Sequence, residues 1–369
     1  MKVLHINCNY LYTALYSCLK KKLDNRGIKN TVYMPTYREH ENTDIDVIAS
    51  KCFKKWDRLL FFRKQKKIYS DIEQKIDISQ IELIHAYILF TDGNVAYNLK
   101  KKYNIPYITH IQNTDVNTFF KYMPHLRRRG LKIMLESSGI IFFSEVYRDR
   151  VLKKYVPRKY RQQILEKSYI IPSGIDDMWL ENQSFKQENP SEKDVLKIAC
   201  VGAINRDKNI MSVVEVAELL NRKGNKCFVD IAGRPENPEV IKEIGKSSCA
   251  EYHGCIPKEE LIKIYRNNDL FILPSFHESF GLVYAEAMSQ GLPVIYTRGE
   301  GFDGQFPEGE VGYSVDPSSV DDIISKINLV LDDYNRISSN CSKNSEVFKW
   351  DVIAEQYSDI YKKNYIKRM

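Results

Sequence analysis

Several features that would restrict the location of this protein are missing from its sequence. No apolar run approaches the roughly 18 residues that are needed to cross a bilayer. The N-terminus turns polar within Met1–Asn7, which is too early for a signal peptide. The eight cysteines are scattered without a CxxC pair, which excludes a zinc-ribbon spacing and favours free thiols. We therefore expect a soluble cytoplasmic protein without a disulfide framework.

The length and composition that are present indicate a globular protein with more than one core. A chain of 369 residues is long for one hydrophobic core, so two domains are expected. Hydrophobic residues make up 43% of the chain and charged residues 28%. These proportions exclude a disordered or fibrous protein.

Charge is distributed unevenly along the chain. Residues 1–170 contain 32 Lys and Arg against 16 Asp and Glu, a net charge of +16, whereas residues 171–369 contain 23 against 32, a net charge of −9. Such an excess in one half indicates an anionic partner, either a membrane surface or a nucleic acid, or else solvated helix faces.

Short apolar runs alternate with longer amphipathic stretches, which predicts parallel sheets covered by helices on both faces. A polar stretch over 181–194 interrupts this alternation and predicts a linker. We expect an α/β fold with two doubly wound, Rossmann-like domains that face each other across a cleft. Their predicted bounds are 1–180 and 195–350, with a last helix over 351–369 that packs back on the first domain. The predicted strands are Val3–Ile6, Thr31–Met34, Ile81–Ile84, Tyr107–Ile111, Ile140–Phe143, Tyr169–Ile171, Leu196–Val201, Phe228–Ala232, Leu270–Leu273 and Pro293–Tyr296.

The segment Asp269–Thr297 is the most informative part of the sequence. A predicted strand ends at Pro274, and Gly281 then allows a close turn into a helix that starts near Leu282. The free amides of a helix start, here those of 279–283, are suited to a phosphate. Glu278 precedes this helix and Glu286 follows eight residues later, and carboxylates accept hydrogen bonds from sugar hydroxyls. The pattern predicts a nucleotide-sugar site.

This segment resembles the E-x7-E signature of the retaining family-4 glycosyltransferases, which have the GT-B fold. The resemblance implies a nucleotide-sugar donor, UDP- or GDP-linked, no cofactor, no obligatory metal, and retention at the anomeric carbon. Glu278 would contact the sugar hydroxyls and Glu286 the ribose. Ile256 lies in a loop, 253–257, that is similar to the family's nucleobase-binding loop. The implied donor-binding residues are Ser279, Phe280, Gly281, Leu282, Val283, Glu286 and Ile256.

The segment Val201–Asn209 supplies two candidate cations for the donor's diphosphate. Lys208 falls on the lysine of the family's G-R-L-x-x-x-K-N/G pattern, whereas the arginine of that pattern is Ala203 here. Arg206, three residues later, is the candidate replacement. A preorganised cation can neutralise the charge that develops on a leaving diphosphate. Lys208 and Arg206 are therefore predicted to be catalytic together with Glu278, although a solvated surface lysine is the alternative for Lys208 taken alone.

Acceptor contacts are expected in the first domain. The stretch Ile105–Phe120 stands where family members often have H-G-x-D, and it retains only the aspartate, Asp115. Gln112 and Asn113 replace the histidine and glycine, so these three residues are the predicted acceptor-binding set. His85 ends a predicted strand and is the remaining candidate for proton transfer, with a purely structural histidine as the alternative.

Basic clusters in the first half adjoin apolar residues, most clearly at Trp56 and Leu59–Phe62. Basic residues beside an apolar edge suit an anionic bilayer. For Leu59–Phe62 taken alone, a buried helix face is the favoured interpretation. Nucleic acid is not expected as a partner, because no recognition module accompanies the charge. The clusters are Lys20–Lys22, Lys54–Lys55, Arg63–Lys67, Lys100–Lys102 and Arg127–Arg129.

The hypothesis that best unites these patterns is a retaining hexosyltransferase. It would move a sugar to a lipid-linked glycan in cell-envelope or exopolysaccharide synthesis, at the inner face of the membrane. Two alternatives remain: a GT-B enzyme of another class, such as a nucleotide-sugar epimerase or a phosphorylase, and a catalytically silent GT-B subunit of a partner transferase. Ala203, Gln112 and the glycine-free loop Asn7–Tyr16 favour the silent subunit, whereas Glu278 and Lys208 oppose it.

Overall fold

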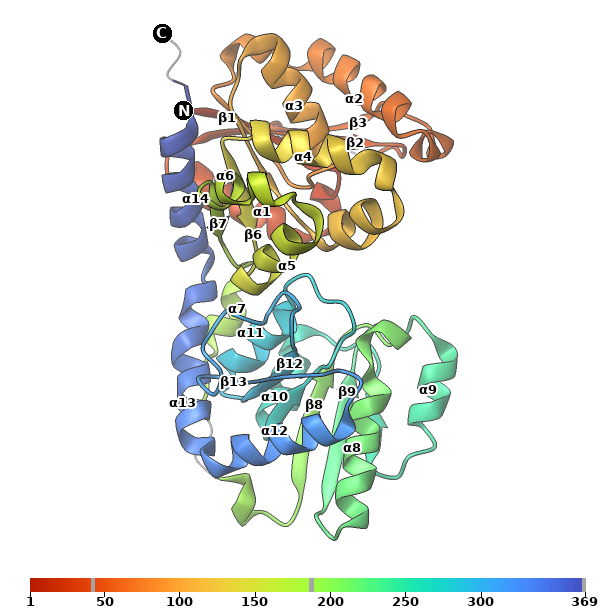
Figure 1. Ribbon diagram of the computed structural model, residues 1–369. Helices are drawn as coiled ribbons and strands as arrows, with labels where there is room; N and C mark the ends of the chain where they lie inside the picture. The colour runs from red at the N-terminus through yellow and green to blue at the C-terminus, as the bar shows by residue number, and fades with distance from the viewer. Residues whose placement is uncertain (41–43, 186–188, 367–369) are drawn as a thin grey trace. The chain divides into compact units, whose positions relative to one another are not determined.

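A computed structural model describes residues 1–40, 44–185 and 189–366 of the chain (Figure 1). The chain forms two compact units. Unit 1 comprises Met1–Phe142, Arg148–Ile171 and Trp350–Met369, and unit 2 comprises Phe143–Tyr147 and Pro172–Lys349. The chain therefore passes from one unit to the other four times, and neither unit is a continuous piece of sequence.

Unit 1 is built on a seven-stranded sheet with the order β3-β2-β1-β4-β5-β6-β7. All of its strands pair in parallel. The central strand β1 is apolar and almost fully buried, as parallel strands covered on both faces are. The strands are β1 (Lys2–Ile6), β2 (Lys29–Thr36), β3 (Val47–Lys51), β4 (Leu83–Ala86), β5 (Tyr107–His110), β6 (Gly139–Phe142) and β7 (Ser168–Ile170).

Helices cover both faces of the unit 1 sheet. On one face α2, α3 and α4 lie side by side, and on the other α1 packs against α14 (Figure 1). Helix α14 lies in the same hydrophobic core as β1 and β4, although it follows the whole of unit 2 in the sequence. The helices are α1 (Ala14–Asp24), α2 (Phe61–Lys75), α3 (Asp92–Tyr103), α4 (Arg127–Glu136), α5 (Glu145–Tyr155), α6 (Arg158–Leu165) and α14 (Trp350–Asn364), and a 3-10 helix, η2 (Lys55–Leu59), precedes α2.

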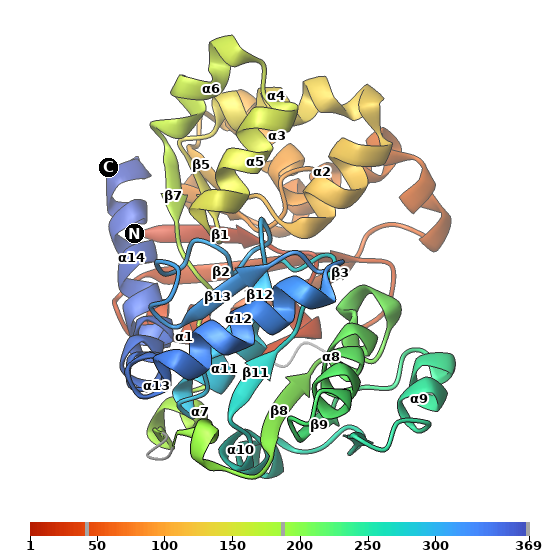
Figure 2. The same cartoon turned by 60° about the horizontal axis from the view of Figure 1, so that its bottom comes forward.

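Unit 2 contains a six-stranded sheet with the order β10-β9-β8-β11-β12-β13. This sheet is also parallel throughout. Helices α8 and α12 lie together on one face, and α10 and α11 lie behind the sheet (Figure 2). The elements are α7 (Asp177–Glu181), β8 (Leu196–Val201), α8 (Ile210–Arg222), β9 (Cys227–Ala232), α9 (Pro238–Ile244), β10 (Ala250–Tyr252), α10 (Lys258–Asn267), β11 (Leu270–Ile272), α11 (Leu282–Ser289), β12 (Val294–Thr297), β13 (Gly312–Val315), α12 (Val320–Asp332) and α13 (Tyr334–Asn344).

The predicted fold class, two Rossmann-like parallel α/β units, is confirmed. The boundary between the units lies elsewhere than expected, at Ile171/Pro172. The polar stretch 181–194 belongs to unit 2, because Trp179 and Leu180 just before it are buried in the unit 2 core. Residues 186–188 of this predicted linker lie outside the described residues. All eight cysteines are free thiols.

The interpretation of Leu59–Phe62 as a buried helix face is wrong. Leu59 is 87% exposed and Phe62 62%, and only Phe61 is partly covered. The run lies at the junction of η2 and α2, and on α2 the buried side chains are Gln65, Ile68 and Ile72, which come later in the helix. In the described part of the chain, no helix is both long and apolar enough to cross a bilayer.

Candidate active site

The candidate site of unit 2 lies where two neighbouring strands diverge. Strands β8 and β11 are adjacent, but β8 leads to β9 on one side and β11 leads to β12 on the other. Such a topological switch point opens a crevice at the carboxyl ends of the strands, where doubly wound sheets bind ligands. The loop after β8 carries Lys208, and the loop after β11 carries Glu278.

The loop after β8 is held by two asparagines. The side chain of Asn205 accepts a hydrogen bond from the Lys208 amide at 3.0 Å. Asn209 has a φ of 54°, in the left-handed region that asparagine tolerates. Its amide group donates to the carbonyl of Pro274 at 3.2 Å and to that of Pro317 at 2.7 Å. Asn209 thereby fastens the loop after β8 to the start of the loop after β11 and to the segment after β13.

Asp207 makes two further connections between these loops. Its carbonyl accepts from the Phe276 amide at 2.8 Å, and its carboxylate lies 2.6 Å from Nδ1 of His277. Because His277 directly precedes Glu278, the position of the glutamate depends on the loop that carries Lys208. The two candidate catalytic residues are therefore presented by one connected assembly.

Lys208 and Glu278 form an ion pair at the centre of this assembly. Nζ of Lys208 lies 2.6 Å from Oε2 of Glu278, and the side chains are 20% and 13% exposed. Partial burial makes such a pair stronger than one on an open surface. The sequence predicts that Lys208 and Glu278 belong to one site. In the structure the two side chains are in contact.

The backbone of Glu278 is held by a loop that sequence analysis missed. The Glu278 amide donates to Oε2 of Glu300 at 2.9 Å, and the Glu278 carbonyl accepts from the Gly301 amide at 3.0 Å. A Cβ on Gly301 would lie 1.8 Å from the Ser279 carbonyl oxygen, so only glycine permits this approach. The two glycines that flank Glu300, shortly after the predicted strand Pro293–Tyr296, are the sequence feature that could have indicated this close-packed loop.

Helix α11 begins at the site with an open N-terminus. Gly281 precedes it with a φ of +82°, and a Cβ there would meet the Tyr284 ring at 2.4 Å. Among the described residues, no group outside the helix accepts a hydrogen bond from the amides of Gly281, Leu282 or Val283. The Phe280 side chain is only 4% exposed and packs in the core. This end of α11 therefore offers backbone donors and the positive end of the helix dipole.

Glu286 lies one turn inside α11, against Trp179 of α7 and Tyr265 of α10. Burial raises the pKa of its carboxyl group to about 7, while Lys258 and the side chains of Trp179 and Tyr265 oppose the rise. Near neutral pH this group therefore exists in both its neutral and ionised forms. It can donate a hydrogen bond in the first form and only accept in the second.

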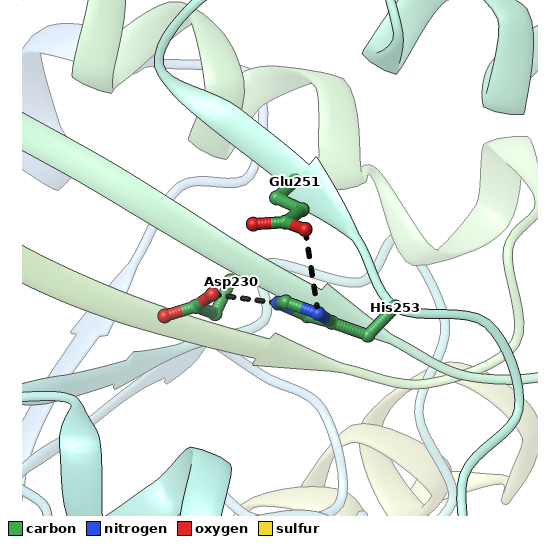
Figure 3. Close-up of side chains that lie close together, drawn as sticks. All are labelled: Asp230, Glu251 and His253. Atoms are coloured by element: carbon green, nitrogen blue, oxygen red, sulfur yellow. Dashed lines mark hydrogen bonds and ion pairs between the residues drawn. The ribbon is translucent and has the colours of Figure 1, made fainter.

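Ile256, the predicted nucleobase contact, lies in a loop that a histidine holds in place. Nε2 of His253 lies 2.6 Å from Oδ1 of Asp230 on β9, and Nδ1 lies 3.9 Å from Glu251 on β10 (Figure 3). The ligand atoms of these three residues lie within 4.8 Å of one another, so they could also hold a metal ion. Ile256 itself is partly buried against the unit 2 core.

Arg206 points away from this assembly. Its guanidinium pairs with Glu239 of α9 at 3.0 Å, and the two side chains are 76% and 74% exposed. In this structure Arg206 therefore does not stand beside Lys208 and Glu278, where a replacement for the family arginine would be expected. Lys208 is the cation that contacts Glu278.

His85, the predicted proton carrier of unit 1, is placed differently from the expectation. It is fully buried in β4, stacked on Tyr87 and His110, and its Nδ1 lies 2.6 Å from the hydroxyl of Tyr361 on α14. Burial lowers its pKa well below the usual value, with positive charge on His110 and His5 as lesser causes. His85 cannot exchange protons with a substrate from this position, so its role is structural.

Asp115 also has a structural role rather than the expected contact with an acceptor. It is fully buried, and its carboxylate accepts from the amides of Leu89, Phe90 and Gln112 at 3.0–3.1 Å. Asp115 therefore ties the loop after β4 to the loop after β5. Burial raises its pKa to about 7, and the three amides oppose the rise.

Gln112 and Asn113 are the members of the predicted acceptor set that remain partly exposed. The Gln112 side chain lies beside the hydroxyl of Tyr16, and Asn113 accepts a hydrogen bond from Asn117. Both lie directly after β5, near the carboxyl end of the unit 1 sheet. Ligand-binding residues of doubly wound sheets gather at this edge.

Together these features give unit 2 a chemistry suited to a phosphorylated ligand with hydroxyl groups. Lys208 and the amides at the start of α11 can bind a diphosphate. Glu278 and Glu286 can accept hydrogen bonds from hydroxyls. The loops are cross-linked by Asn209 and Asp207, which preorganises these groups before a ligand arrives.

Both halves of the chain match models of known protein families. Residues 181–347 match the model described as glycosyl transferases group 1. Residues 18–178 match the model described as glycosyltransferase family 4. A D-inositol 3-phosphate glycosyltransferase of Corynebacterium glutamicum (strain R) is 31% identical over 177 residues, which is 44% of this chain and 42% of that protein. The match thus spans about two fifths of the length of that relative.

Solved structures share the fold over nearly the whole chain. Sucrose-phosphate synthase from Thermosynechococcus elongatus superposes with a TM-score of 0.75 at 17% identity, over 98% of both chains. HepE from Anabaena, in complex with UDP and glucose, gives a TM-score of 0.65 at 15% identity, over 98% of this chain and all of that one.

Proposed function

Both halves of the chain, and its fold, belong to the glycosyltransferases of the GT-B type, and on this premise we propose that it transfers a sugar from a nucleotide-sugar donor, UDP- or GDP-linked, to a glycan acceptor. Transfer retains the configuration of the anomeric carbon. A solved neighbour with UDP and glucose bound supports the choice of donor. The acceptor is a lipid-linked glycan of the cell envelope or an exopolysaccharide.

The observation that carries this proposal is the Lys208–Glu278 ion pair beside the N-terminus of α11. When a donor binds, its diphosphate competes with Glu278 for Lys208 and occupies the free amides of α11. Glu278 is thereby released to accept hydrogen bonds from the sugar hydroxyls, and Glu286 accepts from the ribose. The resting ion pair keeps both charges partnered until the donor replaces it.

In the transfer step the bond between the anomeric carbon and the diphosphate oxygen breaks, and the acceptor oxygen bonds to the same face of that carbon. The acceptor proton passes to the departing diphosphate, so no protein base is required. Lys208 stabilises the negative charge on the diphosphate. This route agrees with the burial of His85, which leaves no imidazole at the predicted place.

Peripheral attachment to the inner face of an anionic membrane is part of the proposal. It is supported by four exposed apolar side chains, Trp56, Leu59, Leu60 and Phe62, which we call the η2–α2 patch. Arg58, Lys66 and other exposed basic residues lie on the same two elements. Apolar side chains enter the headgroup region, and each Lys or Arg near an anionic surface contributes about 1 kcal/mol.

The test is a transfer assay with the full chain, radiolabelled UDP- and GDP-sugars, and a lipid-linked acceptor fraction. We expect label in the lipid fraction and a product with the anomeric configuration of the donor by NMR. Lys208→Ala and Glu278→Ala should each lower the rate of transfer by orders of magnitude, whereas Lys223→Ala, which changes an exposed lysine at the end of α8, should not. A folded protein that transfers no common sugar contradicts the proposal, and turnover without an acceptor would indicate an epimerase.

A further inference from the structure

A cationic hollow lies at the carboxyl edge of the unit 1 sheet. It has a volume of about 310 Å³, and its wall includes Asn9 after β1 and Thr36 at the end of β2. In this sheet β1 leads to β2 on one side, and β4, its other neighbour, leads to β5 on the opposite side. The hollow is therefore beside the switch point of unit 1, where ligands of such sheets bind. Arg38, Arg58 and Lys64 also line it.

The three cations of the hollow have aromatic neighbours, and within residues 1–40, 44–185 and 189–366 they form no ion pair. The guanidinium carbons of Arg38 and Arg58 lie 5.1 and 5.8 Å from the Tyr37 ring centre, and Nζ of Lys64 lies 4.9 Å from that of Phe53. Among the described residues, no carboxylate pairs with any of the three cations. This arrangement leaves positive charge available to an anion from solution.

Two neighbouring cations on helix α2, Arg63 and Lys67, differ from the cations of the hollow because they are paired. Arg63 and Lys67 both contact the fully buried Asp57, at 3.3 and 2.6 Å. Asp57 thus offsets the charge of Arg63 and Lys67, and no ion pair of Asp57 with Arg58 or Lys64 is present among the described residues. The acid that interacts electrostatically with Lys64, Asp92, is buried, and burial raises its pKa to about 7, so its charge is only partial near neutral pH.

An apolar groove adjoins the cationic hollow and shares two of its residues. The groove has a volume of about 420 Å³ and is lined by Arg58 and Lys64 together with Leu60, Phe61 and Phe119. The ring centres of Phe61 and Phe119 lie 6.0 Å apart. Three residues of the η2–α2 patch, Leu59, Leu60 and Phe62, line the groove, and Leu59 and Phe62 are mostly exposed. The groove therefore connects the patch to the cationic hollow.

We propose that unit 1 binds a phosphate-bearing amphiphile, with its phosphate at Arg38, Arg58 and Lys64 and its apolar chain in the groove lined by Leu60, Phe61 and Phe119. This inference rests on the proposed function, because it specifies the acceptor class of the same enzyme. The cationic hollow and the apolar groove meet at Arg58 and Lys64. A phosphate-bearing amphiphile matches this arrangement, because its charged head is joined directly to an apolar tail. A free sugar phosphate would leave the groove unused, and a neutral lipid would leave the cations unpaired.

The inference is tested by calorimetric titration of the full chain with alkyl phosphates, kept below the concentration at which they form micelles. The probes are ethyl, hexyl and dodecyl phosphate, with inorganic phosphate as the head alone and dodecyl maltoside as the chain alone. We expect affinity to rise with chain length, by about fourfold for each methylene that enters the groove. Dodecyl phosphate should bind far more tightly than inorganic phosphate or dodecyl maltoside.

Two variants separate the charged and the apolar parts of the site. The double variant Arg58→Gln/Lys64→Gln should weaken dodecyl phosphate at least about tenfold, since charged hydrogen bonds to phosphate are lost. Leu60→Ser should weaken dodecyl phosphate and leave inorganic phosphate unchanged. The matched control, Lys29→Gln/Lys101→Gln, removes the same charge from the opposite edge of the sheet and should change neither.

Three results would overturn the inference: equal affinity for ethyl and dodecyl phosphate, equal affinity for dodecyl phosphate and dodecyl maltoside, or equal weakening by the double variant and its control. Circular dichroism melting of each variant confirms that it is folded. Titration with UDP-glucose and GDP-mannose tests the donor site of unit 2 separately. Alkyl phosphate binding without donor binding refutes the proposed function and keeps this inference, and the reverse result refutes only the inference.

Discussion

The two units of this protein share a sheet topology but differ in what stands at their switch points. In unit 2 the switch point between β8 and β11 carries a cation that is already partnered, Lys208, at 2.6 Å from Glu278. In unit 1 the switch point between β1 and β4 adjoins a hollow whose cations meet no described carboxylate. The fold determines where a ligand binds, and the side chains in the loops determine which ligand it is.

The comparison also changes the meaning of the uneven charge along the chain. A diphosphate donor would bind in the acidic half, where Lys208 and the start of α11 supply positive charge at the switch point. The basic half places positive charge at its own switch point instead. Local geometry therefore outweighs net charge for the donor, whereas net charge and local geometry act together in unit 1.

The largest expected difference between the two switch points concerns the rate of transfer. Lys208→Ala should lower kcat by about 10²–10³, because a preorganised cation at the leaving group is lost. Arg58→Gln/Lys64→Gln in unit 1 should instead raise the KM for a phosphorylated acceptor and leave kcat within about twofold. Steady-state kinetics with varied donor and acceptor separates the two effects, and a fall in kcat of similar size in both variants would break the comparison.

The buried carboxylates of the two units should differ in their effect on stability. Asp115→Ala in unit 1 leaves the amides of Leu89, Phe90 and Gln112 without an acceptor and should lower the free energy of unfolding by about 3 kcal/mol. Glu286→Gln in unit 2 keeps the shape of the side chain and should cost less than about 1 kcal/mol. Urea denaturation measures both values, and an equally mild Asp115→Ala variant would contradict the structural role assigned to Asp115.

Acid should destabilise unit 1 before unit 2. Burial lowers the pKa of His5 to about 4 and that of His110 to about 3. In the unfolded chain these imidazoles bind protons below the usual histidine pKa of about 6.5. In the folded chain they bind protons only near pH 4 and below. The contribution of these imidazoles to stability is therefore fully present above pH 6.5 and falls as the pH drops toward 4, by up to about 1.4 kcal/mol per pH unit for each imidazole. Asp92 and Asp115, whose pKa values burial raises to about 7, act in the opposite direction over this range. Because the pKa of His85 is lowered as well, three buried histidines outnumber these two carboxyl groups.

The three tryptophans allow this acid effect to be followed in each unit separately. Trp56 and Trp350 belong to unit 1, and Trp179 belongs to unit 2. In Trp179→Phe the fluorescence reports unit 1, and in Trp56→Phe/Trp350→Phe it reports unit 2. Urea titrations between pH 6.5 and 4.5 should show a steeper loss in unit 1. Parallel losses in both units would show that the buried histidines do not govern acid stability.

The smallest expected effect is the dependence of donor binding on pH through Glu286. Its pKa of about 7 means that raising the pH from 6 to 8 converts most of the carboxyl group to the ionised acceptor. Donor affinity should therefore increase severalfold over this range, by less than about tenfold. Calorimetry with the nucleotide sugar measures the change, and Glu286→Gln should show none. An unchanged slope in this variant would exclude Glu286 as the titrating group.

Sequence patterns predicted the inner strands of both sheets and missed three outer ones. Strand β8 was predicted with its observed bounds, Leu196–Val201, because it is central and apolar. Strands β3, β10 and β13 stand at the edges of their sheets. Edge strands are covered on fewer sides, so polar residues interrupt them, as in the Ala-Glu-Tyr of β10. The apolar residues of β3 are limited to Val47–Ala49, whereas β7, also at an edge, was predicted from Tyr169–Ile171.

The proximity of Lys208 and Glu278 in unit 2 was predictable from the sequence, whereas the burial of His85 and Asp115 in unit 1 was not. Lys208 and Glu278 lie in loops whose positions follow from the strands just before them. His85 was misjudged because α14, which buries it, comes from more than 250 residues further along the chain. Asp115 was misjudged because its partners are backbone amides, which no residue pattern reveals.

Helix α14 has a consequence for the order in which the protein is made. Tyr357 and Tyr361 complete the unit 1 core around His110 and His85, yet they leave the ribosome after the whole of Pro172–Lys349. Unit 2 can finish folding while the larger part of unit 1, although synthesised earlier, still exposes an aromatic surface. Synthesis therefore starts with unit 1, but unit 1 is the second unit to complete its fold. A chaperone would be needed at the face of unit 1 that α14 later covers.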